Sequence, residues 1–147
     1  MPSAASESGI SLLNLNTHER LTLPGSKGLL SPRWSPDGHY IAALTADGGS
    51  LRLFEVATQK WVELARLQIG YPSWSRDSKS IFFDTSGKEP AFYRVRISDR
   101  KVDHIVSLTN IRRTGTFAWT GLARDDSPLL LRDAGTDEIY ALDWQAP

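Results

Sequence analysis

The chain has 147 residues, in which 17 lysines and arginines balance 17 aspartates and glutamates, and it has no cysteine. A zero net charge argues against a binder of nucleic acid or of anionic membranes, because both need a clustered positive field. Apolar residues make up 40% of the chain, which is enough for a packed core. Without cysteine there is no disulfide, thiolate metal site or cysteine nucleophile.

The beginning of the chain carries no recognisable targeting signal. Residues 1–9 have no basic side chain, and the apolar residues after them are too few and too interrupted for the core of a signal peptide. No run of about 18 apolar residues occurs, so we expect no membrane insertion. We expect residues 1–9 to be disordered, and both the cytoplasm and the periplasm are compatible with the sequence.

An internal repeat with a period of about 40 residues organises the chain. The segment WSPDGHYI at 34–41 recurs as WSRDSKSI at 74–81, a spacing of 40. A second pattern occurs three times at a spacing of 41, in residues 15–20, 56–61 and 97–102. Several matches at one period are much harder to obtain by chance than one motif, so the repeat is interpreted as real.

A third, degenerate unit starts at Trp119, 45 residues after Trp74. In this alignment residues 120–125 form an insertion before Asp126. A departure of this kind from the repeat marks either a functional loop or drift of the sequence.

Each unit has the local chemistry of short β-strands. Residues 35–38 (SPDG) suit a type I turn, whereas residues 75–78 (SRDS) keep the aspartate but lack the proline and glycine, so we expect a looser turn there. Apolar runs at 40–44, 81–83 and 129–131 follow these turns and read as buried strands. No stretch keeps a helical period over ten residues, so helix content is expected to be near zero.

Four short antiparallel strands at this period are typical of a β-propeller blade. The element at 34–41 resembles the repeat of TolB-like propellers, which are Pro-Asp-containing relatives of the WD repeats. Residues 126–144 are similar to the C-terminal end of propeller regions in bacterial transcriptional regulators and serine/threonine kinases. The resemblance implies an all-β fold with about three four-stranded antiparallel blades in an incomplete ring.

We divide the expected propeller, residues 10–144, into units and leave a tail at 145–147. The units are a half blade at 10–23, whole blades at 29–67 and 70–108, and a three-stranded blade at 115–144. Closed propellers typically have four to eight blades, so this array is expected to expose apolar side chains at both ends, near 12–23 and 129–144.

The recurring tryptophans are expected on the innermost strand of each unit. Their indoles are interpreted as packing between neighbouring blades, because a ligand site rarely repeats its contacts in every blade. Asp37 and Asp77 are interpreted as turn-forming residues rather than metal ligands or catalytic acids. The positions assigned to the repeat are Trp34, Pro36, Asp37, Gly38, Trp74, Asp77 and Trp119.

Signatures of catalysis are missing from the sequence. It has no G-x-S-x-G nucleophile elbow, no phosphate-binding glycine loop and no kinase motif. His18, His39 and His104 fall at different repeat positions and pair with no glutamate at metal-ligand spacing. Residues 133–137 lack the alternating aspartates of a calcium loop and read as a hairpin turn. We therefore expect no enzyme activity, no cofactor and no metal.

These observations favour a non-catalytic interaction or sensor module, the C-terminal part of a longer TolB-like propeller protein. Its partner would be a protein or a small ligand, with Arg112, Arg113, Arg124 and Asp125 in the candidate interaction loops. One alternative is an accessory propeller of a prolyl-oligopeptidase-type hydrolase or serine/threonine kinase encoded elsewhere. The other is a self-assembling oligomer in which several chains complete a ring.

Overall fold

The structure is a computed structural model that describes residues 9–113 and 119–136. Those residues form β-strands joined by turns, and they contain no helix long and apolar enough to cross a bilayer. The strands are β1 (Ser11–Leu13), β2 (Arg20–Thr22), β3 (Leu29–Trp34), β4 (Tyr40–Thr45), β5 (Leu51–Glu55), β6 (Lys60–Ala65), β7 (Ser73–Trp74), β8 (Ser80–Asp84), β9 (Ala91–Arg96), β10 (Val102–Ser107), β11 (Thr120–Leu122) and β12 (Pro128–Leu130).

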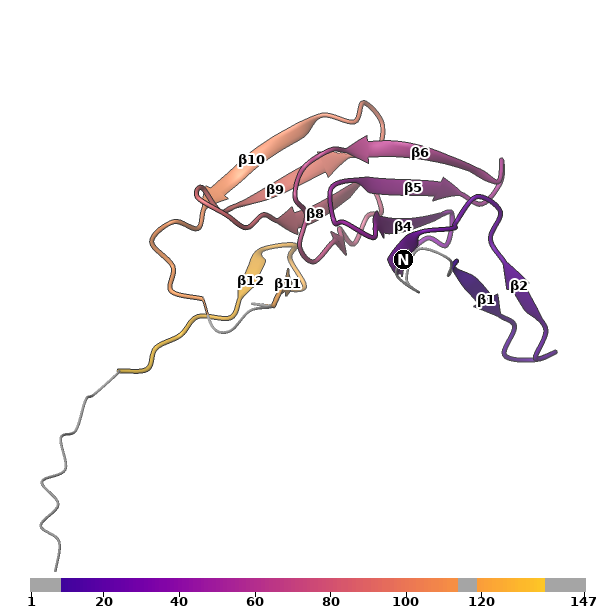
Figure 1. Ribbon diagram of the computed structural model, residues 1–147, viewed down its shortest axis with the longest axis horizontal. Helices are drawn as coiled ribbons and strands as arrows, with labels where there is room; N and C mark the ends of the chain where they lie inside the picture. The colour runs from indigo at the N-terminus through magenta and orange to yellow at the C-terminus, as the bar shows by residue number, and fades with distance from the viewer. Residues whose placement is uncertain (1–8, 114–118, 137–147) are drawn as a thin grey trace, which may run out of the picture.

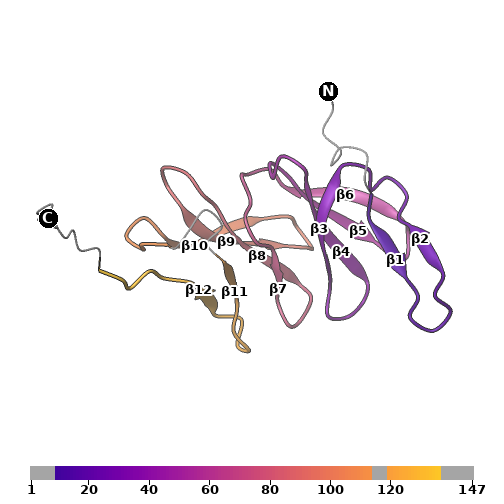
Figure 2. The same ribbon diagram turned by 60° about the horizontal axis from the view of Figure 1, so that its bottom comes forward.

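Two four-stranded antiparallel sheets form the centre of the molecule. Blade I has the order β3-β4-β5-β6, and blade II has the order β7-β8-β9-β10. The pair β1–β2 precedes blade I, and the pair β11–β12 follows blade II. The sheets succeed one another along an arc (Figures 1 and 2), which is the arrangement of a β-propeller whose ring is not closed. The prediction of an all-β propeller fold is confirmed.

The hairpin between the third and fourth strands of a unit occurs three times with one geometry. His18, Gln59 and Arg100 lie 41 residues apart, and all have positive φ, at 59°, 54° and 56°. Each donates its backbone N–H to the carbonyl oxygen four residues earlier, at 2.8 to 3.0 Å. This equivalence makes β1 and β2 the third and fourth strands of a blade, the outer pair.

The turn between the first and second strands is held by side chains. Ser35 Oγ donates to Asp37 Oδ1 at 2.6 Å, and Ser75 Oγ donates to Asp77 Oδ1 at 2.7 Å. In both turns the aspartate also accepts the backbone N–H two residues on. The expectation that the second turn is looser is wrong, because these hydrogen bonds hold it without the proline and glycine.

The turn of the third unit defines how that unit aligns with the others. Asp126 donates its N–H to the carbonyl oxygen of Ala123 at 3.1 Å and has a φ of 63°. Gly38 and Ser78 make the same hydrogen bond, three residues back, with φ of 75° and 59°. Ala123 therefore stands at the turn position of the two serines.

The structure thus places Leu122, and not Trp119, at the position of the repeat tryptophan. Ala123 donates to the carbonyl oxygen of Ser127, one residue nearer than the equivalent Ser35 to Tyr40 hydrogen bond, so this turn is shorter rather than expanded. The expected insertion at 120–125 is therefore wrong. The dipeptide Trp-Thr at 119 imitates Trp-Ser, and the additional residues lie before β11.

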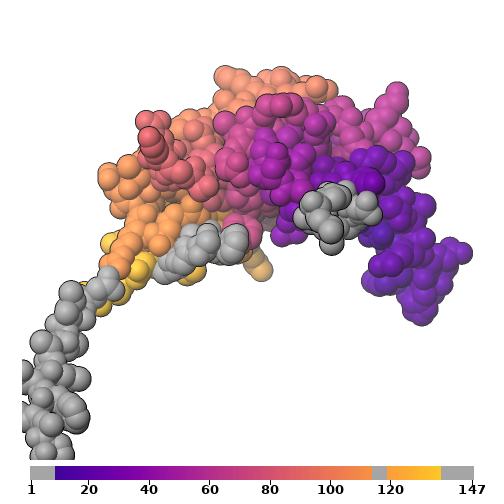
Figure 3. Space-filling view, viewed as in Figure 1, coloured from indigo at the N-terminus to yellow at the C-terminus, as the bar shows by residue number. Residues whose placement is uncertain are grey.

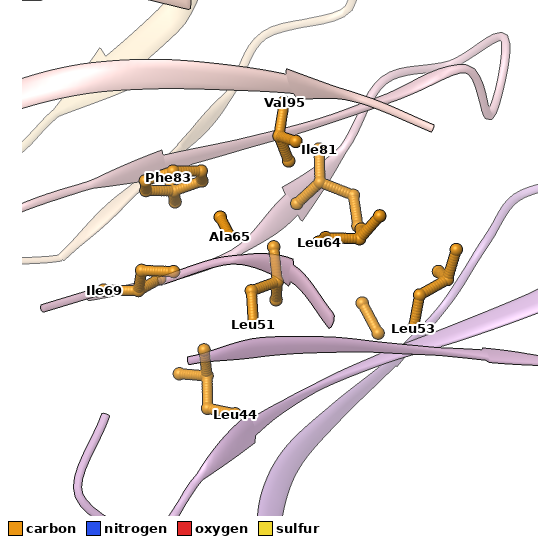
Figure 4. Packing of buried hydrophobic residues seen from close by; sticks show 10 residues of the cluster. Leu44, Leu51, Leu53, Leu64, Ala65, Ile69, Ile81, Phe83 and Val95 are labelled. Carbon is orange, nitrogen blue, oxygen red and sulfur yellow. The ribbon is translucent and has the colours of Figure 1, made fainter. Parts of the chain in front are cut away.

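The blades are joined by two apolar clusters. The larger fills the space between blades I and II and includes Leu44, Leu51, Leu53, Ile81 and Phe83, whose side chains converge in Figure 4. The smaller lies between β1–β2 and blade I and is formed by Ile10, Leu23, Ile41, Ala43 and Phe54. Each sheet is therefore stabilised mainly by burial against its neighbours, at about 25 cal/mol per Å² of apolar surface.

The apolar exposure predicted for the ends of the array is confirmed within the described residues. Leu13, Leu15 and Leu21 are exposed at one end, and Leu129 and Leu131 at the other. Ile10 and Leu23 are instead buried against blade I. The strand expected at 139–144, the tail at 145–147 and residues 1–8 lie outside the described ranges.

Candidate functional site

The repeat tryptophan of blade II packs between the blades. Trp74 donates its indole Nε1–H to the carbonyl oxygen of Arg33 at 3.0 Å. Its ring stacks on Tyr40, with 6.3 Å between ring centroids and 23° between planes. Both partners belong to blade I, as expected for an inter-blade indole.

The equivalent Trp34 of blade I has a different environment. It is 49% exposed, because the preceding unit supplies only the outer pair β1–β2 and no inner strands to cover it. Trp119, outside the repeat position, is also half exposed, and its ring lies over the backbone of Gly121.

A surface groove runs between blades I and II on the side of these turns. Three adjoining cavities, of about 440, 330 and 270 Å³, are all lined by Tyr40. We call this the Tyr40 groove; its lining includes Asp37, His39, Tyr40, Glu55, Asp77, Lys79 and Ile97. A half-buried aromatic ring with charged side chains around it is the composition of a binding site.

The rim of the groove carries two ionised carboxylates. The hydroxyl of Ser35, which donates to Asp37, lowers the pKa of that carboxyl below its ordinary value, and the backbone N–H of His39 lowers it further. The Ser75 hydroxyl and the Lys79 backbone N–H lower the pKa of Asp77 in the same way. His39 lies beside the first carboxylate, with its Nδ1 3.4 Å from Asp37 Oδ2.

Successive turns are linked to one another by hydrogen bonds. The backbone N–H of Asp37 donates to Ser78 Oγ at 3.1 Å, and the backbone N–H of Arg76 donates to Asp126 Oδ1 at 3.1 Å. These links fix the walls of the groove, so its shape is set by the packing of whole blades rather than by one loop.

A buried ion pair lies at the other end of the inner strands. Asp84, at the end of β8, is almost fully buried, and Arg113 Nη2 lies 2.8 Å from its Oδ2. Thr120 donates its hydroxyl to Asp84 Oδ1 at 2.7 Å, and the backbone N–H of Tyr71 donates to the same oxygen at 3.0 Å. These contacts attach β11 to blade II.

The candidate interaction residues of the third unit are not gathered at the groove. Arg113 is largely buried in the ion pair, and Arg112 binds Asp133, with Nε 3.1 Å from Oδ2. Arg124 and Asp125 lie beyond the other end of β11. There the carbonyl oxygen of Arg124 accepts a hydrogen bond from the Arg76 guanidinium, and Asp125 closes its turn by accepting from Ser127.

Sequence reasoning missed two features of this surface. Tyr40 was read only as the start of a strand, and its role as groove floor depends on the neighbouring blade. Asp84 had a usable signal, since it ends the apolar run at 81–84 with a charge. Within the part of the chain that the structure describes, no group of three or more His, Asp or Glu side chains is placed to hold a metal.

No protein-family model matches the chain, and no curated protein matches it. Solved structures do. TolB from Acinetobacter baumannii is 20% identical with a TM-score of 0.60, covering 92% of this chain and 46% of TolB. The β-propeller domain of the Trilobed protease from Pyrococcus furiosus, which has an open velcro topology, is 18% identical with a TM-score of 0.58, covering 76% of this chain and 36% of that one.

The acylaminoacyl peptidase from Pyrococcus horikoshii is 15% identical with a TM-score of 0.62, covering 84% of this chain and 24% of the peptidase. Together these similarities establish the fold as that of a β-propeller of the kind found in TolB and in peptidase propeller domains. The chain spans less than half the length of each of these structures.

Proposed function

We propose that the chain is a non-catalytic interaction module, part of a longer TolB-like propeller protein, and that it binds a partner protein in the Tyr40 groove. The observation that carries the proposal is the groove itself, in which three adjoining cavities share one half-buried tyrosine. Propellers present such surfaces at the ends of strands from neighbouring blades.

The chemistry of the groove favours an extended segment with an apolar side chain next to a basic one. The apolar side chain would pack on the ring of Tyr40 and on Ile97, both of which line the groove. The basic group would meet Asp37 and Asp77, which stay ionised at neutral pH because their pKa values are lowered. An aromatic floor supplies most of the affinity in contacts of this kind, and the charges fix the orientation.

A comparison of two charge variants tests this proposal. His39→Glu/Lys79→Glu changes two exposed residues of the groove, and Lys88→Glu with Thr58→Glu changes exposed residues elsewhere on the turns. Thr58 is itself at the outer margin of the groove, so the stricter control is Lys88→Glu alone against Lys79→Glu alone. Proteins retained from an extract of the source cells are quantified by mass spectrometry for each immobilised variant.

We expect at least one protein to be retained equally by the unsubstituted chain and by Lys88→Glu, and to change at least tenfold with Lys79→Glu. Its binding to the purified chain should then saturate and weaken with salt, because the contact is partly ionic. Equal retention by both variants would contradict the proposal.

A second candidate is an accessory propeller of a peptidase. The observation that favours it is that propeller domains of several peptidases share this fold. The reading frame that encodes the chain decides this candidate. A hydrolase catalytic domain in the same frame would support it, and a frame with further propeller repeats and no such domain would contradict it.

A further inference from the structure

The two ends of the arc are incomplete in complementary ways. At one end β1 and β2 are the outer pair of a blade without an inner pair. At the other end β11 and β12 are the inner pair of a blade, and the described residues contain no outer pair beside them. The two ends stand apart in every view (Figures 1 to 3), so they do not complete one another within one chain.

Exposed apolar side chains mark the inner half of this mismatch. Trp34 and Leu30 are exposed on β3, where an inner pair is missing. Leu129 and Leu131 are 42% and 50% exposed beside and beyond the inner pair β11–β12. Strand alternation directs both leucines to one face, and Leu130 between them is less exposed on the other.

The outer half of the mismatch is marked in the same way. Leu12 packs on the cluster beside blade I, so the alternating Leu13 points away from blade I, and it is exposed. On blade II, Phe83 packs toward blade I, so Phe92 faces away from it, and the exposed Val106 pairs with Phe92. An outer pair placed after blade II would bring Leu13 onto Val106.

Blade II shows how a repeat tryptophan is received by the inner pair before it. Trp74 donates to the carbonyl oxygen of Arg33, the residue that precedes the repeat position of blade I. The equivalent carbonyl of the last unit is that of Gly121, which precedes Leu122. Of the inner pairs in the described residues, β11–β12 is the one that no following tryptophan of the chain occupies.

We propose that two copies of the chain close one ring, in which β12 of each copy pairs with β1 of the other and Trp34 of each copy docks on the Gly121 carbonyl of the other. The twelve described strands make three blades at four strands per blade, so two copies make six. Three copies would exceed the usual four to eight blades. The interface is independent of the Tyr40 groove.

The repeat also sets the register of the new strand pair. Pro128 pairs with Leu122 as Ile41 pairs with Trp34, which gives Leu129 the place of Ala42. Ala42 pairs with Leu53, and Leu12 lies 41 residues before Leu53. Leu129 of one copy should therefore lie opposite Leu12 of the other, with Cα atoms about 5 Å apart.

The mass in solution tests the assembly. Sedimentation equilibrium of the full chain should give twice the chain mass of 16.3 kDa. Trp34→Lys should give a folded monomer with an unchanged far-ultraviolet circular dichroism spectrum. The control Val102→Lys, which changes an exposed valine on the face toward blade I, should remain a dimer.

A monomeric chain overturns the proposal, since the open edges are then covered by residues 137–147 or by other blades of a longer protein. Trimers, or chains that add without limit, also overturn it. A dimer that persists in Trp34→Lys does so as well, because the contact then lies elsewhere.

Cross-linking tests the register, and the absence of native cysteine makes the result unambiguous. A chain carrying Leu12→Cys is mixed with one carrying Leu129→Cys and oxidised. A disulfide-linked pair should form from the mixture and should not form when Val102→Cys replaces Leu12→Cys. Equal cross-linking by both combinations would overturn the proposed pairing.

Discussion

Asp84 is the residue at which blade II departs most from blade I. The repeat places it opposite Leu44, which lies in the apolar cluster between the blades. Asp84 instead accepts hydrogen bonds from Thr120 and from the backbone of Tyr71, and it pairs with Arg113. A buried carboxylate with several partners exchanges apolar burial for a directional attachment of the next unit.

We expect Asp84→Leu to lower the free energy of unfolding by about 3 to 5 kcal/mol, because Arg113 is only 15% exposed and would lose its counter-charge. The double variant Asp84→Leu/Arg113→Met should recover most of that loss, since it buries no uncompensated charge. Urea unfolding at neutral pH measures both. A single variant as stable as the unsubstituted chain would contradict this role for the ion pair.

Carboxyl groups in the turns and on the strands make stability depend on pH. Hydrogen bonds from serine and threonine hydroxyls, backbone N–H groups and arginine side chains hold their pKa values below the ordinary 3.8 for aspartate and 4.5 for glutamate. The groups are Asp37, Asp47, Glu63, Asp77, Asp99, Asp103 and Asp125.

Because these pKa values are lower in the folded chain, the unfolded chain takes up protons first as the pH falls. The stabilisation is complete above the ordinary values, and it is lost as the pH falls below about 4.5 and through the folded pKa values. We expect urea midpoints that are level from pH 7 to about 5.5 and decline toward pH 3. Asp77→Asn should make the decline shallower, and midpoints that rise in acid would contradict the prediction.

At the scale of single elements, the turns show how the repeat tolerates changes of sequence. Ser78 has a φ of 59°, a conformation in which glycine is favoured, yet its Oγ accepts the Asp37 N–H of the neighbouring turn. Gly38 at the equivalent position of blade I has no side chain to offer. The serine thus accepts local strain and gains a link between blades.

Two substitutions separate these effects. Ser78→Ala loses the link and keeps the strain, whereas Ser78→Gly loses the link and relieves the strain. Ser78→Gly should therefore be more stable than Ser78→Ala by about 1 kcal/mol in urea unfolding. Equal stability of the two variants would show that the left-handed conformation costs nothing at this position.

Strands and turns could be predicted from the sequence because their signals are local. Apolar runs and a spacing of 41 residues located both whole blades, and they related His18 to Gln59 and Arg100. The third unit was misaligned because Trp119-Thr120 has the same local pattern as the repeat. Its true alignment follows from the hydrogen bond between Asp126 and Ala123, which is set by backbone geometry.

The candidate site was less predictable than the elements that carry it. The Tyr40 groove exists only where two blades meet, so a reading of one repeat at a time does not reveal it. Arg112 and Arg113 look alike in sequence, yet Arg113 is buried because the distant Asp84 lies beside it. In each case the determining contact is long-range.

At the scale of the whole molecule, the blades are expected to unfold together. The apolar cluster between blades I and II takes residues from both, with Leu44, Leu51 and Leu53 on one side and Ile81, Phe83 and Val95 on the other. Loss of either sheet would expose the cluster face of the other. A shared core of this kind couples neighbours in a repeat array.

Phe83→Ala tests this coupling, because the side chain is fully buried in the shared cluster. We expect a loss of about 3 to 5 kcal/mol in the free energy of unfolding. Amide hydrogen exchange should accelerate in β4 and β5 of blade I as well as in β8 and β9. The matched control Phe92→Ala removes an equally buried ring on the face away from blade I.

Exchange in β4 and β5 should follow the two substitutions differently if part of blade II can open alone. Phe92→Ala loosens blade II on its far face, so it should accelerate blade I only through global unfolding. Phe83→Ala removes contacts of blade I itself and should act on β4 and β5 even where unfolding is local. Unchanged exchange in blade I after Phe83→Ala would mean that the blades fold independently and that the shared cluster does not couple them.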